Sequence, residues 1–165
     1  MTSIVDRSTA ALAGKFLMFF LASEEYGIEI LRVQEIISMM PATRVPLTPP
    51  FIRGVINLRG KVIPIVDLRE KFGLPASPEP EQVIIVVQVG AVQIGVVADS
   101  VSEVASIAAA DIDPAPDFGE GFCTEFLLGL GKSNGRLRLL LDISRVLSTD
   151  DISALSSLPA VTLNP

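Results

Sequence analysis

The stretch FIRGVINLRGKVIPIVDLREKF (residues 51–72) decides the fold, because a second version of it, FLLGLGKSNGRLRLLLDISRVL, follows at residues 126–147. The two stretches align without a gap at an offset of 75 residues. The matched positions are an aromatic residue, two glycines, a basic residue and an aspartate: Phe51/Phe126, Gly54/Gly129, Gly60/Gly135, Lys61/Arg136 and Asp67/Asp142. Such a duplication separates residues that both copies need for folding from residues that one copy alone keeps for another purpose.

The segments upstream of these stretches repeat as well, at an offset of 68 residues. The matched positions include a glycine, a glutamate and several β-branched residues: Gly27/Gly95, Ile28/Val96, Val33/Val101, Glu35/Glu103 and Ile36/Val104. The two offsets differ because the second copy has one longer connection, which contains an acidic loop at residues 111–121.

Alternating apolar residues and turn residues predict about five short strands in each copy. The first copy has a hairpin, a single strand, a proline-rich segment and a second hairpin, at residues 15–21 with 26–31, 33–39, 41–50 and 53–67. The second copy begins with two buried strands that turn at Gly90. Because five short, twisted strands are too few for an open sheet, we expect each copy to close into a small barrel.

The second hairpin of the first copy has a turn and a helix start that the sequence specifies. Asn57-Leu58-Arg59-Gly60 predicts a type I turn with Arg59 on its exposed tip. Asp67 is expected to cap a short helix at residues 68–72, with Glu70 completing a capping box. The second copy repeats the capping aspartate.

These patterns predict a mostly β protein made of two tandem five-stranded barrels with short helices. The expected divisions are a flexible N-terminus (1–14), a first barrel (15–74), a proline-rich linker (75–81), a second barrel (82–147), a C-terminal helix (148–158) and a loose tail (159–165). A unit of this size buries only about 60% of its surface alone. We therefore expect the two barrels to pack against each other.

The composition excludes several functions. The chain of 165 residues has no histidine and a net charge of −6, with a pI near 4.6. Histidine-dependent catalysis and histidine metal sites are therefore excluded, and the negative charge argues against binding nucleic acid. Mean hydropathy is +0.52, but the longest uncharged run, residues 82–98, is shorter than the roughly 20 residues of a spanning helix. A single cysteine and an N-terminus without signal-peptide features favour the cytoplasm, without membrane insertion.

The other candidates for chemistry have simpler structural interpretations. An acidic set suggests calcium binding, but intervening prolines break the ligand spacing: Asp111, Asp113, Asp117 and Glu120. Asp67 and Asp142 could be paired catalytic carboxylates, but helix capping explains both. Cys123 lacks a nearby base and is interpreted as an incidental thiol. No catalytic, metal-binding or cofactor-binding residue is predicted, and an enzyme that uses carboxylates and lysine is the alternative.

Arg59 is the position at which the comparison of the copies is most informative. Its counterpart is Asn134, a commoner turn residue, so the turn itself does not require arginine. A charged side chain with five donors on a rigid tip is suited to binding a carboxylate or backbone carbonyl of a partner. An arginine kept only for solubility is the alternative interpretation. Glu35 is matched by Glu103, which indicates a structural use in both copies.

Three segments resemble the CheW family of chemotaxis coupling proteins: EEYGIEILRVQEI (24–36), FIRGVINLRGKVIPIVDLREKFG (51–73) and LLLDISRVLSTDDI (139–152). Together with the two-copy layout, the resemblance extends over about residues 15–157. It implies two five-stranded SH3-like β-barrels packed on a shared apolar core. It also implies a non-catalytic, cofactor-free adaptor in the cytoplasm, recruited to membrane-associated receptor arrays.

The resemblance further implies two partners and a site. The adaptor would join the cytoplasmic tips of chemoreceptors to the regulatory domain of the histidine kinase CheA. The receptor-binding residues would lie on the first barrel, with two turn residues supporting them: Val33, Glu35, Gly54 and Arg59, supported by Asn57 and Gly60. The kinase would bind mainly the second barrel, among the apolar strands of residues 83–97. We expect an ion pair between Glu35 and Arg59, and the alternative function is an adaptor of a pilus or other non-flagellar chemosensory pathway.

Overall fold

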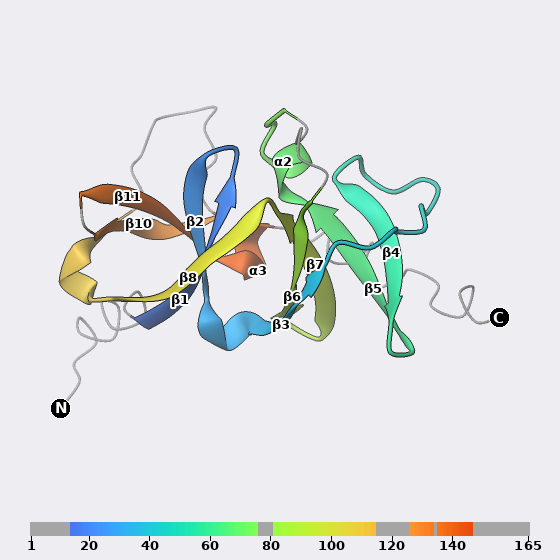
Figure 1. Cartoon of the computed structure of the whole chain (residues 1–165), viewed down its shortest axis with the longest axis horizontal. Helices are drawn as coiled ribbons and strands as arrows, with labels where there is room; N and C mark the ends of the chain where they lie inside the picture. Colours follow the sequence, from blue (N-terminus) through green and yellow to red (C-terminus); the bar gives the residue numbers. More distant parts are fainter. Residues whose placement is uncertain (1–13, 76–80, 115–125, 134, 147–165) are drawn as a thin grey trace.

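The computed structural model describes residues 14–75, 81–114, 126–133 and 135–146, and these residues are mostly β-strand (Figure 1). The strands in this part of the chain are β1 (Gly14–Leu21), β2 (Glu24–Glu29), β3 (Val33–Ser38), β4 (Ile52–Leu58), β5 (Lys61–Asp67), β6 (Val83–Val89), β7 (Val92–Ala98), β8 (Ser100–Ile107), β9 (Ile112–Asp113), β10 (Leu127–Ser133) and β11 (Arg136–Leu141). Its short helices are η1 (Ile30–Arg32), α2 (Leu68–Lys71), η2 (Ala109–Asp111) and α3 (Ile143–Val146). The C-terminal helix expected at residues 148–158 lies outside the described residues, as does most of the acidic loop.

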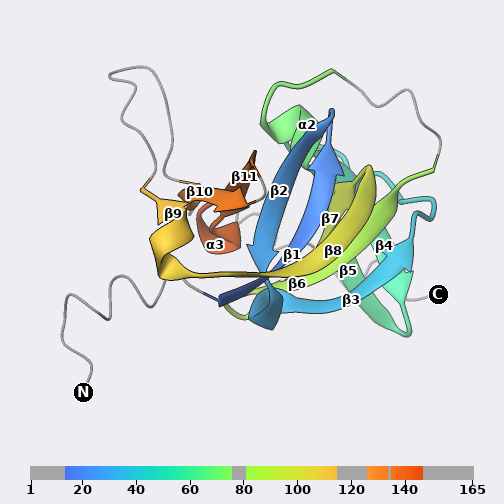
Figure 2. The same cartoon turned by 60° about the vertical axis from the view of Figure 1, so that its left-hand side comes forward.

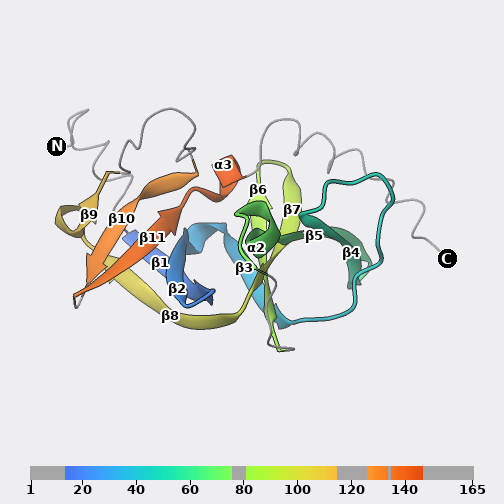
Figure 3. The ribbon, with the colours of Figure 1, turned by 90° about the horizontal axis from the view of Figure 1, so that it is seen from above.

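The strands form two sheets, which Figure 1 shows as two lobes. The six-stranded sheet, with strand order β8-β1-β2-β11-β10-β9, forms what we call barrel A. The five-stranded sheet, with strand order β3-β6-β7-β5-β4, forms what we call barrel B. Seen from above, each sheet curls around its own interior (Figure 3). The fold class predicted from the sequence is therefore confirmed.

The hairpins predicted from the sequence are also confirmed. Antiparallel pairs join β1 to β2, β4 to β5, and β6 to β7, and each pair is connected by two residues. In the first hairpin, the loop residues Ala22 and Ser23 have φ of 51° and 74°. Two-residue loops of this left-handed kind match the natural twist of the strands they connect.

The expected division into one barrel at residues 15–74 and another at residues 82–147 is wrong. The β1–β2 hairpin of the first copy lies in barrel A with β8 to β11 of the second copy, and β6–β7 of the second copy lies in barrel B with β3 to β5 (Figure 2). The two copies thus exchange their N-terminal hairpins. The parallel pairs β2/β11 and β5/β7 hold this exchange. Because the two copies have the same pattern, the N-terminal hairpin of either copy can pair with the C-terminal hairpin of either copy. In this structure each N-terminal hairpin pairs with the C-terminal hairpin of the other copy.

The apolar side chains form three clusters, one inside each barrel and a larger one between the barrels. Strand β1 shows how alternation divides them. Phe16 and Met18 point into barrel A, whereas Leu17, Phe19 and Leu21 point into the shared cluster. Strand β6 is likewise buried on both faces. The expected shared core is therefore present, and it is built from the exchanged hairpins.

The two repeated aspartates cap helices, as the sequence predicts. The Asp67 carboxylate accepts hydrogen bonds from the amides of Arg69 (3.0 Å) and Glu70 (3.4 Å) at the start of α2. Asp142 accepts from the amide of Ser144 (3.1 Å) at the start of α3. The amide of Asp67 donates to the carbonyl of Phe51 (2.7 Å). Glu70 is therefore not needed to satisfy that amide, as it would be in a capping box.

Candidate protein-docking site

The loop that carries Arg59 is tighter than the sequence predicts. Leu58 pairs with Lys61, so the loop consists of Arg59 and Gly60 alone, with φ of 51° and 87°. Two left-handed residues define a type I′ turn, and the predicted type I turn is wrong because that turn would splay two twisted strands. The Asn57 side chain accepts a hydrogen bond from the amide of Gly60 (2.8 Å), which supports the turn.

Arg59 occupies this turn at a conformational cost. A residue other than glycine or asparagine in the left-handed region is disfavoured by roughly 1–2 kcal/mol. The second copy has the pair Asn134-Gly135 at this place, which is the sequence that a type I′ turn prefers. Ala22 and Ser23 have similar φ in the first hairpin, so this strain marks Arg59 as a candidate functional residue only together with its exposed side chain and the asparagine of the second copy.

The Arg59 side chain forms the expected ion pair with Glu35, from Nη2 to Oε2. Strands β3 and β4 are the two edges of the barrel B sheet, so the ion pair lies where the curled sheet closes. The pair forms one rim of a hollow of about 210 Å³, which we call the barrel B hollow: Glu35, Leu58, Arg59, Lys61, Ile63 and Gln93. The Arg59 side chain is 69% exposed and that of Glu35 is 32% exposed. Most of the guanidinium therefore remains accessible to another molecule.

The repeat places a different set of residues at the corresponding end of barrel A. Glu103 corresponds to Glu35, and Arg138 corresponds to the apolar Ile63. Arg138 donates to Glu25 (3.2 Å) and to Glu103 (2.8 Å), and Glu25 also pairs with Arg136. Arg138 and Glu25 have side chains only 3% and 5% exposed. This end of barrel A is thus filled by its own balanced charges, whereas barrel B keeps an apolar floor.

Sequence reasoning missed this buried charge network, although the repeat contained a signal for it. Glu25 aligns with Gln93 and Arg138 aligns with Ile63, so barrel A has a charged pair where barrel B has an uncharged pair. The interpretation of Glu103 as structural agrees with its bond to Arg138. The comparison leaves barrel B as the barrel whose end is suited to docking.

The structure does not bring the other two expected site residues to the same surface. Val33 begins β3 and is partly buried against the shared cluster. Gly54 is buried in β4 with φ of 146°, and an added Cβ would fall on the carbonyl group of Thr43. Thr43 and Val55 exchange two backbone hydrogen bonds of 2.8 Å. Gly54 therefore seats the segment before β4, and its effect on the docking site is indirect.

The strands expected to face the kinase are buried. Val83 and Val92, near one end of each strand, are partly buried against the shared cluster. The other valines and isoleucines are each at most 3% exposed: Ile84, Ile85, Val86, Val87, Val89, Ile94, Val96 and Val97. They belong to β6 and β7, which lie in barrel B together with the Arg59 turn. The expectation that residues 83–97 present the kinase surface is therefore wrong, because both faces of these strands pack into cores.

The described residues also lack the features of a metal site and of a membrane-spanning helix. Among the described residues, no group of three or more acidic or cysteine side chains gathers as metal ligands would. Within the same residues, no helix combines the length and apolar character needed to cross a membrane.

The described strands form a two-barrel scaffold with a polar rim at one end of barrel B, and comparisons with known proteins identify its family. The model of the CheW-like domain matches residues 15–151. The chain is 46% identical over 140 residues to the Chemotaxis protein CheW of Klebsiella aerogenes, covering 84% of each chain. It is 35% identical over 141 residues to that of Rhizobium meliloti, covering 85% of this chain and 91% of the relative.

A solved structure agrees with these relatives. The crystal structure of the scaffolding protein TtCheW from Thermoanaerobacter tengcongensis matches with a TM-score of 0.76 and 32% identity, covering 84% of this chain and 95% of that one. The protein belongs to the CheW-like family, a family of non-catalytic chemotaxis adaptors.

Proposed function

We propose that this protein couples chemoreceptors to the histidine kinase CheA, and that the receptor docks at the barrel B hollow. Family membership supports the adaptor role, since its relatives are chemotaxis proteins. The observation that carries the site is Arg59, which is kept in a left-handed turn position where the second copy has asparagine. In this proposal the protein works in the cytoplasm, at the membrane-associated arrays that contain the receptors.

The chemistry of the rim fits a helical receptor tip. Arg59 offers a planar fork of donors that can bind a carboxylate or an exposed helix carbonyl. Glu35 holds the arginine across the closure of the barrel and orients it. The apolar floor at Ile63 accepts an apolar side chain, while the charged rim sets the orientation of the helix.

The kinase binds elsewhere, on barrel A. Two large apolar side chains of that barrel are about half exposed, Val104 on β8 (51%) and Leu137 on β11 (55%). We assign these two side chains to the kinase contact. Receptor and kinase would then be held on different barrels of one body. Each contact alone would be small, and repeated copies in an array would add avidity.

The test uses Arg59→Glu with Arg44→Glu as the matched control. Both substitutions reverse one exposed arginine of barrel B, but Arg44 lies in the segment before β4 and outside the hollow. We expect Arg59→Glu to abolish binding to an immobilised receptor fragment while binding to the kinase is unchanged. Arg44→Glu should bind both partners normally. Equal loss of receptor and kinase binding by Arg59→Glu would reject the separation of the two docking faces.

A further inference from the structure

Between β1 and β11, the described strands pass from one barrel to the other twice, and the two crossings differ. The first is η1, between β2 of barrel A and β3 of barrel B, and the second is Asp99, between β7 of barrel B and β8 of barrel A. The repeat offset of 68 places Leu31 at the position of Asp99. Leu31 is 94% exposed, whereas the Asp99 side chain is 17% exposed and fully engaged in polar contacts.

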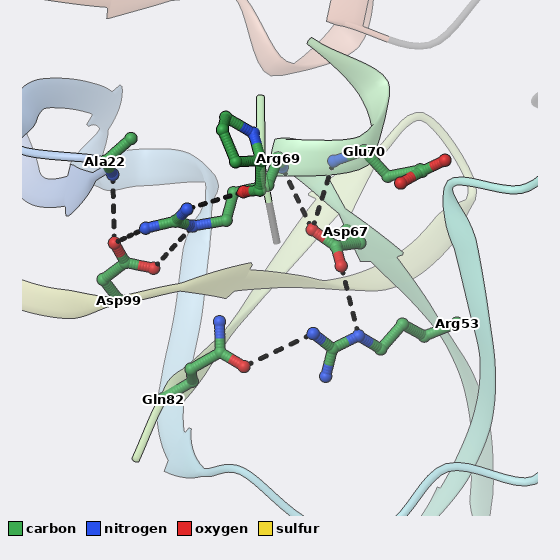
Figure 4. Close-up of polar contacts among 8 residues, drawn as sticks. Ala22, Arg53, Asp67, Arg69, Glu70, Gln82 and Asp99 are labelled. Carbon is green, nitrogen blue, oxygen red and sulfur yellow. Dashed lines mark hydrogen bonds and ion pairs between the residues drawn. The ribbon is translucent and has the colours of Figure 1, made fainter. Parts of the chain in front are cut away.

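Asp99 joins elements of both barrels (Figure 4). Its carboxylate accepts two hydrogen bonds from the Arg69 guanidinium of α2, at 3.1 Å from Nε and 2.5 Å from Nη2. It also accepts from the amide of Ala22, in the β1–β2 turn of barrel A, at 3.0 Å. A third guanidinium nitrogen of Arg69 donates to the carbonyl of Pro75 at 2.7 Å. One carboxylate thus ties the β1–β2 turn of barrel A to the helix that follows β5 of barrel B.

Neither residue of this pair is part of the repeated pattern. Arg69 aligns with Ser144, which bonds to the capping Asp142 of its own helix, and Asp99 aligns with Leu31. Both copies therefore form their strands and capped helices without this ion pair. As with Arg59, a residue that only one copy contains indicates a use beyond building the repeat.

The ion pair adds a directional constraint to the packing of the shared core. Apolar burial holds the barrels together but has no preferred direction. A bidentate arginine–carboxylate pair fixes both distance and orientation, because two parallel bonds form only in one plane. Burial alone would raise the pKa of Asp99, but the bonds from Arg69 and Ala22 bring it below its ordinary value, so the pair stays charged.

We propose that the Arg69–Asp99 ion pair is a latch that fixes the angle between the two barrels, and that kinase activation depends on this angle. The proposal rests on the coupling function above. In the proposed function, receptor and kinase bind different barrels. A change in the bound receptor can therefore reach the kinase only if the two barrels keep a defined orientation to each other. Loss of the latch should leave each docking surface intact and loosen the relation between them.

The test compares Asp99→Asn and Arg69→Lys with Arg53→Gln as the matched control. Arg53 pairs with Asp67 at 3.2 Å in the same region, but both residues belong to barrel B. Spin labels at Ser38→Cys on β3 and Ser106→Cys on β8, in a Cys123→Ser background, report the distance between the barrels. Both serines are exposed on edge strands.

We expect the two latch variants to broaden the distribution of label distances, while Arg53→Gln resembles the unsubstituted protein. In reconstituted signalling mixtures, the latch variants should bind receptor fragment and kinase normally but activate the kinase several-fold less. Arg69→Lys keeps the positive charge but removes the planar guanidinium that makes two parallel bonds. If Asp99→Asn does not fold, Arg69→Lys alone tests the proposal.

A latch variant with an unchanged distance distribution, or a broadened one with full kinase activation, would overturn the proposal. An equal broadening by Arg53→Gln would also overturn it. The distance measurement needs no partner, so failure of the unsubstituted protein to bind a receptor would count against the proposed function and not against the latch.

Discussion

Replacing Arg59 by asparagine should abolish receptor docking without weakening the fold. The residue has φ of 51° in a type I′ turn, where a residue such as arginine is disfavoured by roughly 1–2 kcal/mol and asparagine by less. The lost ion pair with Glu35 joins side chains that are 69% and 32% exposed. Such pairs contribute about 0–1 kcal/mol. We therefore expect the free energy of unfolding to stay the same or to rise by up to about 1 kcal/mol.

The reciprocal substitution, Asn134→Arg, provides the control. It changes the position that the repeat matches to Arg59 but that belongs to the second copy, so receptor binding should be kept. Urea unfolding measures the stability of Arg59→Asn against the parent protein. Circular dichroism is the suitable signal, because a chain with no tryptophan and one tyrosine gives little intrinsic fluorescence. A loss of clearly more than 1 kcal/mol in Arg59→Asn, or receptor binding retained by it, would refute the assignment of Arg59 to function.

Three other substitutions test the interior contacts. Gly54→Ala should lower the free energy of unfolding by about 2–4 kcal/mol, since it strains the backbone and displaces the two hydrogen bonds of Thr43; a urea midpoint equal to that of the parent would contradict this. Asp99→Asn should lose about 3 kcal/mol near neutral pH. The pKa of Asp99 is lowered in the folded protein, so the stabilisation from this carboxylate is complete above the ordinary aspartate range. This stabilisation disappears as pH falls through the folded pKa, so the acid unfolding curves of Asp99→Asn and of the parent protein should converge at low pH. Arg138→Met should cost about 3 kcal/mol, because the buried Glu25 would lose its buried partner and keep only the half-exposed Arg136. Adding Glu25→Gln should restore much of this stability, and equal instability of the single and double variants in thermal melts would show that packing dominates.

The strands, their hairpins and the capped helices could be predicted because local residues specify them. Alternation and turn residues act over a few positions, and a capping aspartate acts within three residues. The exchange of hairpins could not be predicted, because a duplicated pattern makes two pairings equally plausible. The choice between them depends on how the copies pack in three dimensions.

The site shows the same contrast between near and distant information. The Glu35–Arg59 pair was expected, but the turn type was not, because arginine is rare in a left-handed turn. The Arg69–Asp99 and Arg138–Glu25 pairs join residues 30 and 113 positions apart, and no spacing rule links them. The two copies differ at these positions, since Arg69 aligns with Ser144 and Arg138 aligns with Ile63. This difference does not show which residue each arginine contacts.

The exchanged hairpins have a consequence for how the chain folds as it leaves the ribosome. All strands of barrel B lie between Val33 and Ala98, so this barrel can close while the rest of the chain is still being made. The β1–β2 hairpin is synthesised first, yet its parallel partner β11 begins only at Arg136. Partners so far apart in sequence assemble slowly. The earliest of the described strands to be made therefore wait longest for this partner, with an apolar surface that a chaperone could cover in the meantime.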